Sequence, residues 1–169
     1  MRSAPTKLFS FPNPVNEIAA RTVAGGVVVM SIAAVTFDSR WIVLALAYGF
    51  WARVLTGPRL SPLGQLATRV VAPRLKAEGR FVPGPPKRFA QAIGAAFSTT
   101  AVILWFGPGW IDAAMAATTM LAAAALGEAA FGYCLGCKVF GLLMRVGVIP
   151  EEVCPQCADI SLRHPELAR

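Results

Sequence analysis

The chain has 169 residues, of which 56% are apolar and 15% are charged, and its formal net charge is +7. A soluble domain usually has about a quarter charged residues, and the mean hydropathy of this chain is +0.57. The composition therefore argues against a water-soluble domain. It also argues against nucleic acid as the binding partner of the basic residues. So apolar a chain is better solvated by lipid, and basic loops are common beside membrane spans.

Four apolar stretches follow one another along the chain. They run from about residue 18 to 37, from 41 to about 55, from about 89 to 106, and from near 111 to at least 131. A membrane span needs roughly 20 apolar residues, with about 17 as the short limit, so the last two stretches qualify and the second is short. We predict an all-α membrane protein with four transmembrane helices in two hairpins. A re-entrant hairpin is the alternative for the first two stretches.

The first apolar stretch is expected to stay in the protein as a membrane helix. It begins late for a secretory signal peptide and lacks a clear cleavage site. In the second stretch, Arg53 lies near the end of the predicted helix. Its guanidinium group is expected to reach the lipid headgroups.

The loop at 56–88 holds seven cations, whereas the linkers at 38–40 and 107–112 together hold only Arg40. By the positive-inside rule, the loop and both termini should face the cytoplasm. We therefore divide the chain into a transmembrane domain at 1–133, which includes the basic loop, and a cytoplasmic-side four-cysteine segment at 134–169. The seven cations of the loop are Arg59, Arg69, Arg74, Lys76, Arg80, Lys87 and Arg88.

A short amphipathic helix is predicted inside the basic loop. Ser61 can cap a helix that begins at Pro62, and Pro73 should end it. Its apolar residues recur at helical spacing, which predicts a helix lying on the inner leaflet. The proline-rich stretch at 79–87 is expected to be a stiff connector.

All four cysteines lie in the last part of the chain, as two C-x2-C pairs separated by sixteen residues: Cys134, Cys137, Cys154 and Cys157. This spacing is typical of a tetrahedral four-thiolate zinc site, so zinc is the cofactor that we expect. Such a site would tie the C-terminal tail to the fourth helix. His164, the sole histidine, is a weaker ligand candidate because four cysteines already complete the site.

Three alternatives to zinc remain open for the cysteines. The first is a dithiol that exchanges electrons or sulfur with a soluble thioredoxin-like or sulfur-transfer protein. The second is an iron–sulfur or other soft-metal site, and the third is four unconnected cysteines. If the fourth helix runs from Ala113 to about Tyr133 and continues, Cys134 and Cys137 share one helix face at the interface.

Glu128 is the only acid well inside a predicted span, so it is a candidate functional residue, and an ion or proton pathway is the hypothesis that it supports. On a continuous helix it lies about 120° or more from the first cysteine pair. We therefore expect Glu128 to face a neighbouring helix and not the thiols.

Several segments resemble a bacterial membrane family catalogued as domain of unknown function 4395. They are residues 13–17 (NPVNE), 57–62 (GPRLSP), 85–89 (PPKRF) and 132–137 (GYCLGC). The resemblance implies a multi-span membrane protein with paired C-x2-C motifs and no established activity. It places the protein in the bacterial cytoplasmic (inner) membrane.

The sequence favours a membrane scaffold or assembly subunit with a zinc-type site over the dithiol module. A small transporter that uses Glu128 is the third hypothesis. The sequence shows no nucleophile with a base, no phosphate-binding glycine loop and no carboxylate pair, so no catalytic residue is assigned. The expected partners are the lipid bilayer and a soluble thiol protein, without nucleic acid. The sequence does not specify the oligomeric state.

Overall fold

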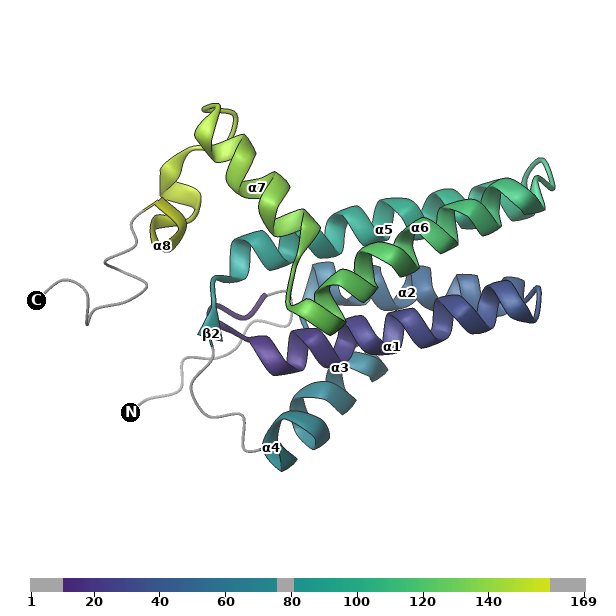
Figure 1. Ribbon diagram of the computed structural model, residues 1–169, viewed down its shortest axis with the longest axis horizontal. Coiled ribbons are helices and arrows are strands. Elements are labelled where there is room, and N and C mark those ends of the chain that lie inside the picture. Colours follow the sequence, from purple (N-terminus) through teal and green to yellow (C-terminus); the bar gives the residue numbers. More distant parts are fainter. Residues whose placement is uncertain (1–10, 76–80, 159–169) are drawn as a thin grey trace, which may run out of the picture.

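The computed structural model describes residues 11–75 and 81–158, without the side chains of Gln156 and Ala158. Four long helices lie side by side in an elongated bundle (Figure 1). They are α1 (Glu17–Thr36), α2 (Arg40–Thr56), α5 (Gly84–Phe106) and α6 (Ile111–Phe131). The short elements are β1 (Val15–Asn16), α3 (Pro62–Leu66), the π-helical turn η1 (Ala67–Val71), α4 (Ala72–Arg74), β2 (Phe81–Val82), α7 (Leu135–Arg145), the 3-10 turn η2 (Glu151–Val153) and α8 (Pro155–Ala158).

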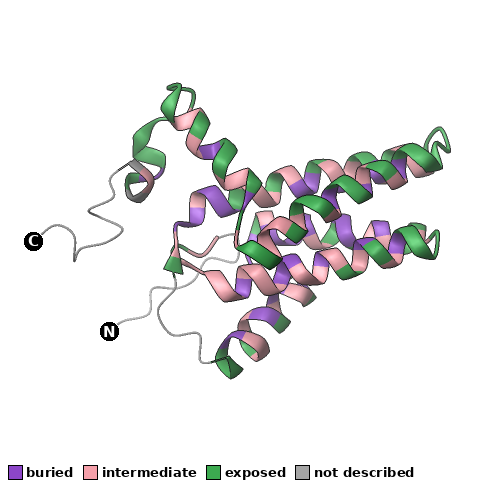
Figure 2. Ribbon diagram, viewed as in Figure 1, coloured by how far each residue is buried: buried purple, intermediate pink, exposed green. Residues whose placement is uncertain are grey.

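Helices α1, α5 and α6 are long and apolar enough to cross a membrane. Large apolar side chains on them point outward: Val29 is 68% exposed, Ile103 is 61% exposed and Met120 is 60% exposed. Figure 2 shows that exposed residues run along α5 and α6 and along the second half of α1. Because so much apolar surface would be unfavourable in water, the surrounding solvent is lipid, and the chain is a membrane protein. Helix α2 forms at the second apolar stretch, as predicted. Its 17 residues are at the short limit for crossing a membrane, so the fourth transmembrane span stays a prediction.

Both hairpin turns lie at one end of the bundle, and the remaining short elements lie at the other (Figure 1). Residues 37–39 connect α1 to α2, and residues 107–110 connect α5 to α6. At the opposite end, β1 pairs antiparallel with β2, so that Val15 lies beside Val82. This pairing joins the start of α1 to the start of α5, a connection that the sequence did not indicate.

The bundle is held together by close packing of small and medium side chains. The central cluster consists of Val27, Leu46, Phe50, Ala95 and Leu121, which come from all four long helices. The Phe50 ring lies against Gly94, where an added Cβ would be only 2.2 Å from a ring carbon. Inside a bilayer the hydrophobic effect does not bring helices together, because lipid tails are as apolar as the side chains. Helices associate there through close packing of this kind.

The predicted loop helix exists and begins where expected. The hydroxyl of Ser61 accepts a hydrogen bond from the backbone N–H of Gly64 at 3.2 Å, and Pro62 is the first helical residue. The predicted stop at Pro73 is wrong, because the helical segment continues through α4 to Arg74. Leu63 and Ala67 pack against α1, so much of the apolar face is buried in protein. Contact with the inner leaflet stays a prediction.

Helix α6 ends earlier than predicted. Gly132 adopts the left-handed conformation, with φ of 67°, and its N–H donates to the carbonyl of Glu128 at 3.0 Å. The N–H of Tyr133 donates to the carbonyl of Gly127 at 3.1 Å, which completes a glycine-dependent helix stop. The prediction that the fourth helix runs on into the first cysteine pair is therefore wrong. The chain turns at Gly132, and α7 leaves the bundle at an angle (Figure 1).

Helix α5 begins earlier than predicted. Its first turn contains Gly84, Pro85, Pro86 and Lys87, which the sequence analysis assigned to a stiff connector. Prolines are well tolerated in the first turn of a helix, because the N–H groups that they lack have no helical partner there. This extension brings Lys87 out of the loop and into the bundle.

Candidate functional site

Helix α7 is docked onto α5 by two contacts. A Cβ added to Gly136 would lie 2.6 Å from the Cα of Ala90, so only glycine allows the two helices to approach this closely. Further along α7, the ring of Phe140 meets the ring of Phe89 edge-on, with 5.7 Å between the centroids. These contacts fix the beginning of α7, where the first cysteine pair lies.

Cys134 is the N-cap residue of α7, and Cys137 follows in the first turn of that helix. Both are free thiols. Cys134 is only 7% exposed, whereas Cys137 is half-buried. The two thiols lie within hydrogen-bonding reach of each other, and the backbone N–H of Cys137 also interacts with the sulfur of Cys134. The two cysteines are therefore a contacting pair, with one sulfur directed inward and the other more accessible.

An ion pair lies beside this thiol pair. Lys87, from the first turn of α5, bonds to Glu128, near the end of α6. The side chains are only 9% and 14% exposed, respectively. Charges of both residues act on the sulfurs of Cys134 and Cys137. A buried ammonium, a carboxylate and two thiols thus form one polar cluster at this end of the bundle.

Glu128 does face a neighbouring helix, since it pairs with Lys87 of α5, but the prediction that it faces away from the thiols is wrong. It assumed one continuous helix, but the turn at Gly132 brings Cys134 back toward α6. Glu128 and Cys134 line the same cavity. The candidate acid and the candidate thiols therefore belong to one site.

The two thiols of the pair differ in acidity. A side-chain hydrogen bond from Cys137 lowers the pKa of Cys134, and the positive charge of Lys87 acts in the same direction. For Cys137 the same hydrogen bond raises the pKa, because losing its proton would break the bond, and burial acts in the same direction. Cys134 is therefore the sulfur that forms a thiolate first and the better leaving group of the pair.

The second cysteine pair is separate from the first. Cys154 and Cys157 are joined to each other by a disulfide at α8. Within residues 11–75 and 81–158, no group of three or more His, Cys, Asp or Glu side chains is placed to hold a metal ion. A tetrahedral site on all four sulfurs would require reduction of the Cys154–Cys157 bond, because zinc binds thiolates. The zinc site stays a prediction, and His164 lies outside the described residues.

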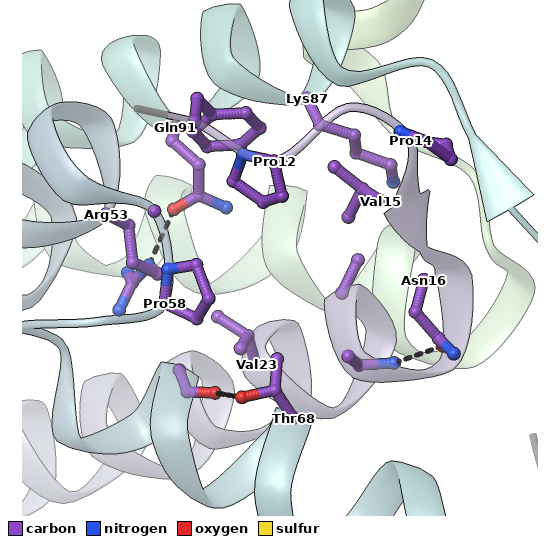
Figure 3. A pocket seen from close by; sticks show the side chains of 15 residues that line it. Pro12, Pro14, Val15, Asn16, Val23, Arg53, Pro58, Thr68, Lys87 and Gln91 are labelled. Atoms are coloured by element: carbon purple, nitrogen blue, oxygen red, sulfur yellow. Dashed lines mark hydrogen bonds between the residues drawn. The ribbon is translucent and has the colours of Figure 1, made fainter. Parts of the chain in front are cut away.

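Arg53 does not reach outward, contrary to the prediction. It is buried at the end of α2. Its Nε donates to Oε1 of Gln91 at 2.7 Å, and its Nη1 donates to the hydroxyl of Ser61 at 3.1 Å. Figure 3 shows Arg53, Gln91 and Lys87 around a cavity of about 150 Å³, with the Arg53–Gln91 bond drawn as a dashed line. Side-chain oxygens of Gln91 and Ser61 thus accept hydrogen bonds from the guanidinium group of Arg53, which was expected to contact lipid headgroups.

A second cavity, of about 270 Å³, lies between α1, α5, α6 and the start of α7. We call it the thiol cavity, because Cys134 lines one end of it together with Glu128 and Gln91. Most of its remaining wall is apolar, including Val27, Phe97 and Leu121. The sulfur of Cys134 therefore lies at the polar end of a mostly apolar chamber.

Lys87 and Gln91 are the site residues that sequence reasoning missed. In the sequence, Lys87 is one of the loop cations, and Gln91 falls inside an apolar stretch. The signal was present in the sequence, because a proline pair followed by an apolar stretch is a helix start. Starting α5 at that pair places Lys87 and Gln91 four residues apart, on one helix face.

Comparison with models of protein families matches residues 15–145 to the family described as Domain of unknown function (DUF4395). The match includes the four long helices and α7, together with Cys134 and Cys137, and it ends before Cys154 and Cys157. Comparisons with curated proteins and with solved structures give no match.

Proposed function

Because the chain belongs to the DUF4395 family, whose description gives no activity, we propose a function from the residues themselves: a membrane-embedded dithiol that exchanges disulfides with a soluble thioredoxin-like partner. The observation that carries this proposal is the contacting pair of free thiols at the start of α7. A C-x2-C pair at a helix N-terminus beside a lysine is a setting that favours a reactive thiolate. The sequence favours the zinc-type scaffold, and the free thiols of Cys134 and Cys137 are the reason that this function is proposed ahead of it.

The exchange step begins from a Cys134–Cys137 disulfide. A thiolate of the reduced partner attacks the sulfur of Cys137, the more accessible of the two, and a mixed disulfide forms. The Cys134–Cys137 bond breaks, and Cys134 leaves as a thiolate beside Lys87. The second thiolate of the partner then attacks the partner sulfur that is bonded to Cys137. The disulfide of the partner forms, and Cys137 is released as a thiolate. Two electrons and two protons move from the partner dithiol to the cysteine pair.

The proposal includes the membrane topology. Four spans in two hairpins would put both turns on one face of the membrane, in keeping with their common place at one end of the bundle. The positive-inside rule makes the opposite, cation-rich end cytoplasmic, together with the basic loop, the termini and the thiols. This orientation is that of an inner-membrane protein whose dithiol meets cytoplasmic partners.

The topology is tested with new cysteines at Ser39 and Gly109, one in each hairpin turn, in a background without the native cysteines. A membrane-impermeant maleimide applied to intact cells should label both positions. Labelling of Gly109→Cys alone would support a re-entrant α1–α2 hairpin. Labelling of neither position would reverse the proposed orientation.

The exchange is tested on the full-length chain, purified in detergent and oxidised, with reduced thioredoxin as the probe. Thiols that appear are counted by alkylation and mass spectrometry. The Cys154→Ser/Cys157→Ser variant should still be reduced by thioredoxin, because it keeps the first pair. The matched Cys134→Ser/Cys137→Ser variant should lose the exchange assigned to that pair.

The zinc scaffold is the competing hypothesis, and it predicts a different outcome. The purified protein would then carry one zinc per chain, each single cysteine substitution would release the metal, and thioredoxin would leave the first pair unchanged. That result would refute the dithiol proposal.

A further inference from the structure

The thiol cavity has the composition of a site for a small ring with an apolar body and a polar edge. An apolar protein cavity of about 150 Å³ is enough to bind benzene, and the thiol cavity has about 270 Å³. Of the residues that line it, Met120 on helix α6 is also 60% exposed. The chamber is therefore reachable from the lipid side, and a ligand soluble in the bilayer can enter it.

The polar end of the cavity is formed by Gln91, Glu128 and Cys134. Gln91 lines this cavity as well as the smaller one drawn in Figure 3, where its side-chain oxygen accepts a hydrogen bond from Arg53 at 2.7 Å. Cys134 contributes a thiol, and Glu128 is paired with Lys87 at the same end. A flat ring with polar carbonyl groups at its edge fits polar side chains at one end and apolar walls along the rest.

The chemistry of the thiols narrows the choice of ligand. A dithiol that is turned over repeatedly needs an acceptor for two electrons and two protons. An acceptor inside an apolar chamber has to be lipid-soluble. Quinones are lipid-soluble carriers that accept two electrons and two protons. An acyl chain would fill the apolar walls but could not be reduced.

We propose that the thiol cavity binds a lipid-soluble quinone, which oxidises the Cys134–Cys137 dithiol. This inference rests on the proposed dithiol function and names its electron acceptor.

The Cys134 thiolate adds to a ring carbon of the quinone, so that a sulfur–carbon bond forms and the ring takes up one proton. The Cys137 thiolate then attacks the Cys134 sulfur. The sulfur–sulfur bond forms, the sulfur–carbon bond breaks with its electron pair going to the ring, and the ring takes up the second proton as hydroquinone. Both protons come from the two thiols.

The test uses the full-length reduced chain in nanodiscs under anaerobic conditions, with decyl-ubiquinone as the probe. Quinone reduction and loss of free thiols are followed together. We expect one quinone reduced per Cys134–Cys137 pair, at a rate that saturates with quinone concentration. Ala125 lines the cavity, whereas Ala123 is exposed on the same helix and does not. Ala125→Phe should therefore slow the reaction at least about tenfold, a barrier of roughly 1.4 kcal/mol, and Ala123→Phe should change it by less than about twofold.

Folding and location are checked independently of the rate. Helix content and melting temperature show whether Ala125→Phe is folded. If it is not, photolabelling of the wild-type chain with an azidoquinone replaces it, and the label should map to cavity residues and be displaced by decyl-ubiquinone. A rate that does not saturate, a folded Ala125→Phe variant that reacts normally, or label spread over the outer surface would each overturn the quinone site.

The two proposals fail in different ways. If reduced thioredoxin exchanges with the cysteine pair but decyl-ubiquinone does not oxidise it, the dithiol function stands and the quinone site is wrong. If the quinone oxidises the pair but thioredoxin does not reduce it, the quinone site stands and the thioredoxin-like partner is wrong.

Discussion

The ion pair between Lys87 and Glu128 should be one of the larger single contributions to the stability of the bundle. The two side chains are only 9% and 14% exposed, and they join the beginning of α5 to the end of α6. Removing one member of a buried pair costs about 3–5 kcal/mol, because the other charge is left without a partner. Some exposure remains here, so we expect the lower end, about 3 kcal/mol. That corresponds to roughly a hundredfold change in the ratio of folded to unfolded protein.

The prediction is tested with Lys87→Met, Glu128→Leu and the double variant, each unfolded in mixed micelles with increasing dodecyl sulfate and followed by tryptophan fluorescence. Each single variant should lose about 3 kcal/mol. The double variant should recover most of the loss, since an apolar pair of similar volume is often as stable as a buried ion pair.

Lys138→Met is the control. Lys138 is exposed on α7, where its ammonium lies 5.4 Å from the centroid of the Tyr133 ring, so we expect a change of less than about 1 kcal/mol. A double variant as unstable as the sum of the two single variants would refute the reasoning.

Two further predictions concern how the site is held in place. Gly136→Val should destabilise the docking of α7 on α5, by about 1–3 kcal/mol of overpacking against Ala90, and should slow exchange with thioredoxin. Gly141→Val on the same helix has open space around it, so a loss of exchange there as well would contradict the packing argument. Arg21 donates to the last carbonyls of α6, at 2.7 Å to Ala130, and Arg21→Met should cost about 1–2 kcal/mol in the unfolding assay. The matched change at the exposed Arg145 should cost less than about 0.5 kcal/mol, and equal effects of the two substitutions would argue against the capping role.

The sequence predicted the long helices well because their apolar stretches are long and end at clear signals. Gly57 and Gly107 follow α2 and α5 as expected, and Ser61 caps α3. What failed was the continuation of α6 beyond Gly132. A glycine inside an apolar stretch is compatible both with helix and with a left-handed stop. The tertiary contacts of α7 decide between the two, and they involve residues distant in sequence, such as Ala90 and Phe89.

The candidate site was predicted in part. The spacing of the cysteines and the position of Glu128 inside an apolar stretch identify these residues as functional candidates, but they do not predict their proximity. Proximity depends on the turn at Gly132 and on Lys87 being helical, and neither follows from local patterns. The joining of the four cysteines in one site was inferred from spacing, which cannot distinguish a shared metal from two independent pairs.

The turn between α5 and α6 offers a practical handle for experiments on this protein. Its residues 107–110 are exposed, and the 20 residues of α5 from Lys87, beside the thiols, to this turn separate the two by roughly 30 Å at 1.5 Å per residue. Exposed turns with few contacts are the places where inserted sequence is best tolerated. A fluorescent reporter or affinity tag inserted after Gly109 should leave the chemistry undisturbed and provide a means of immobilising or tracking the active protein.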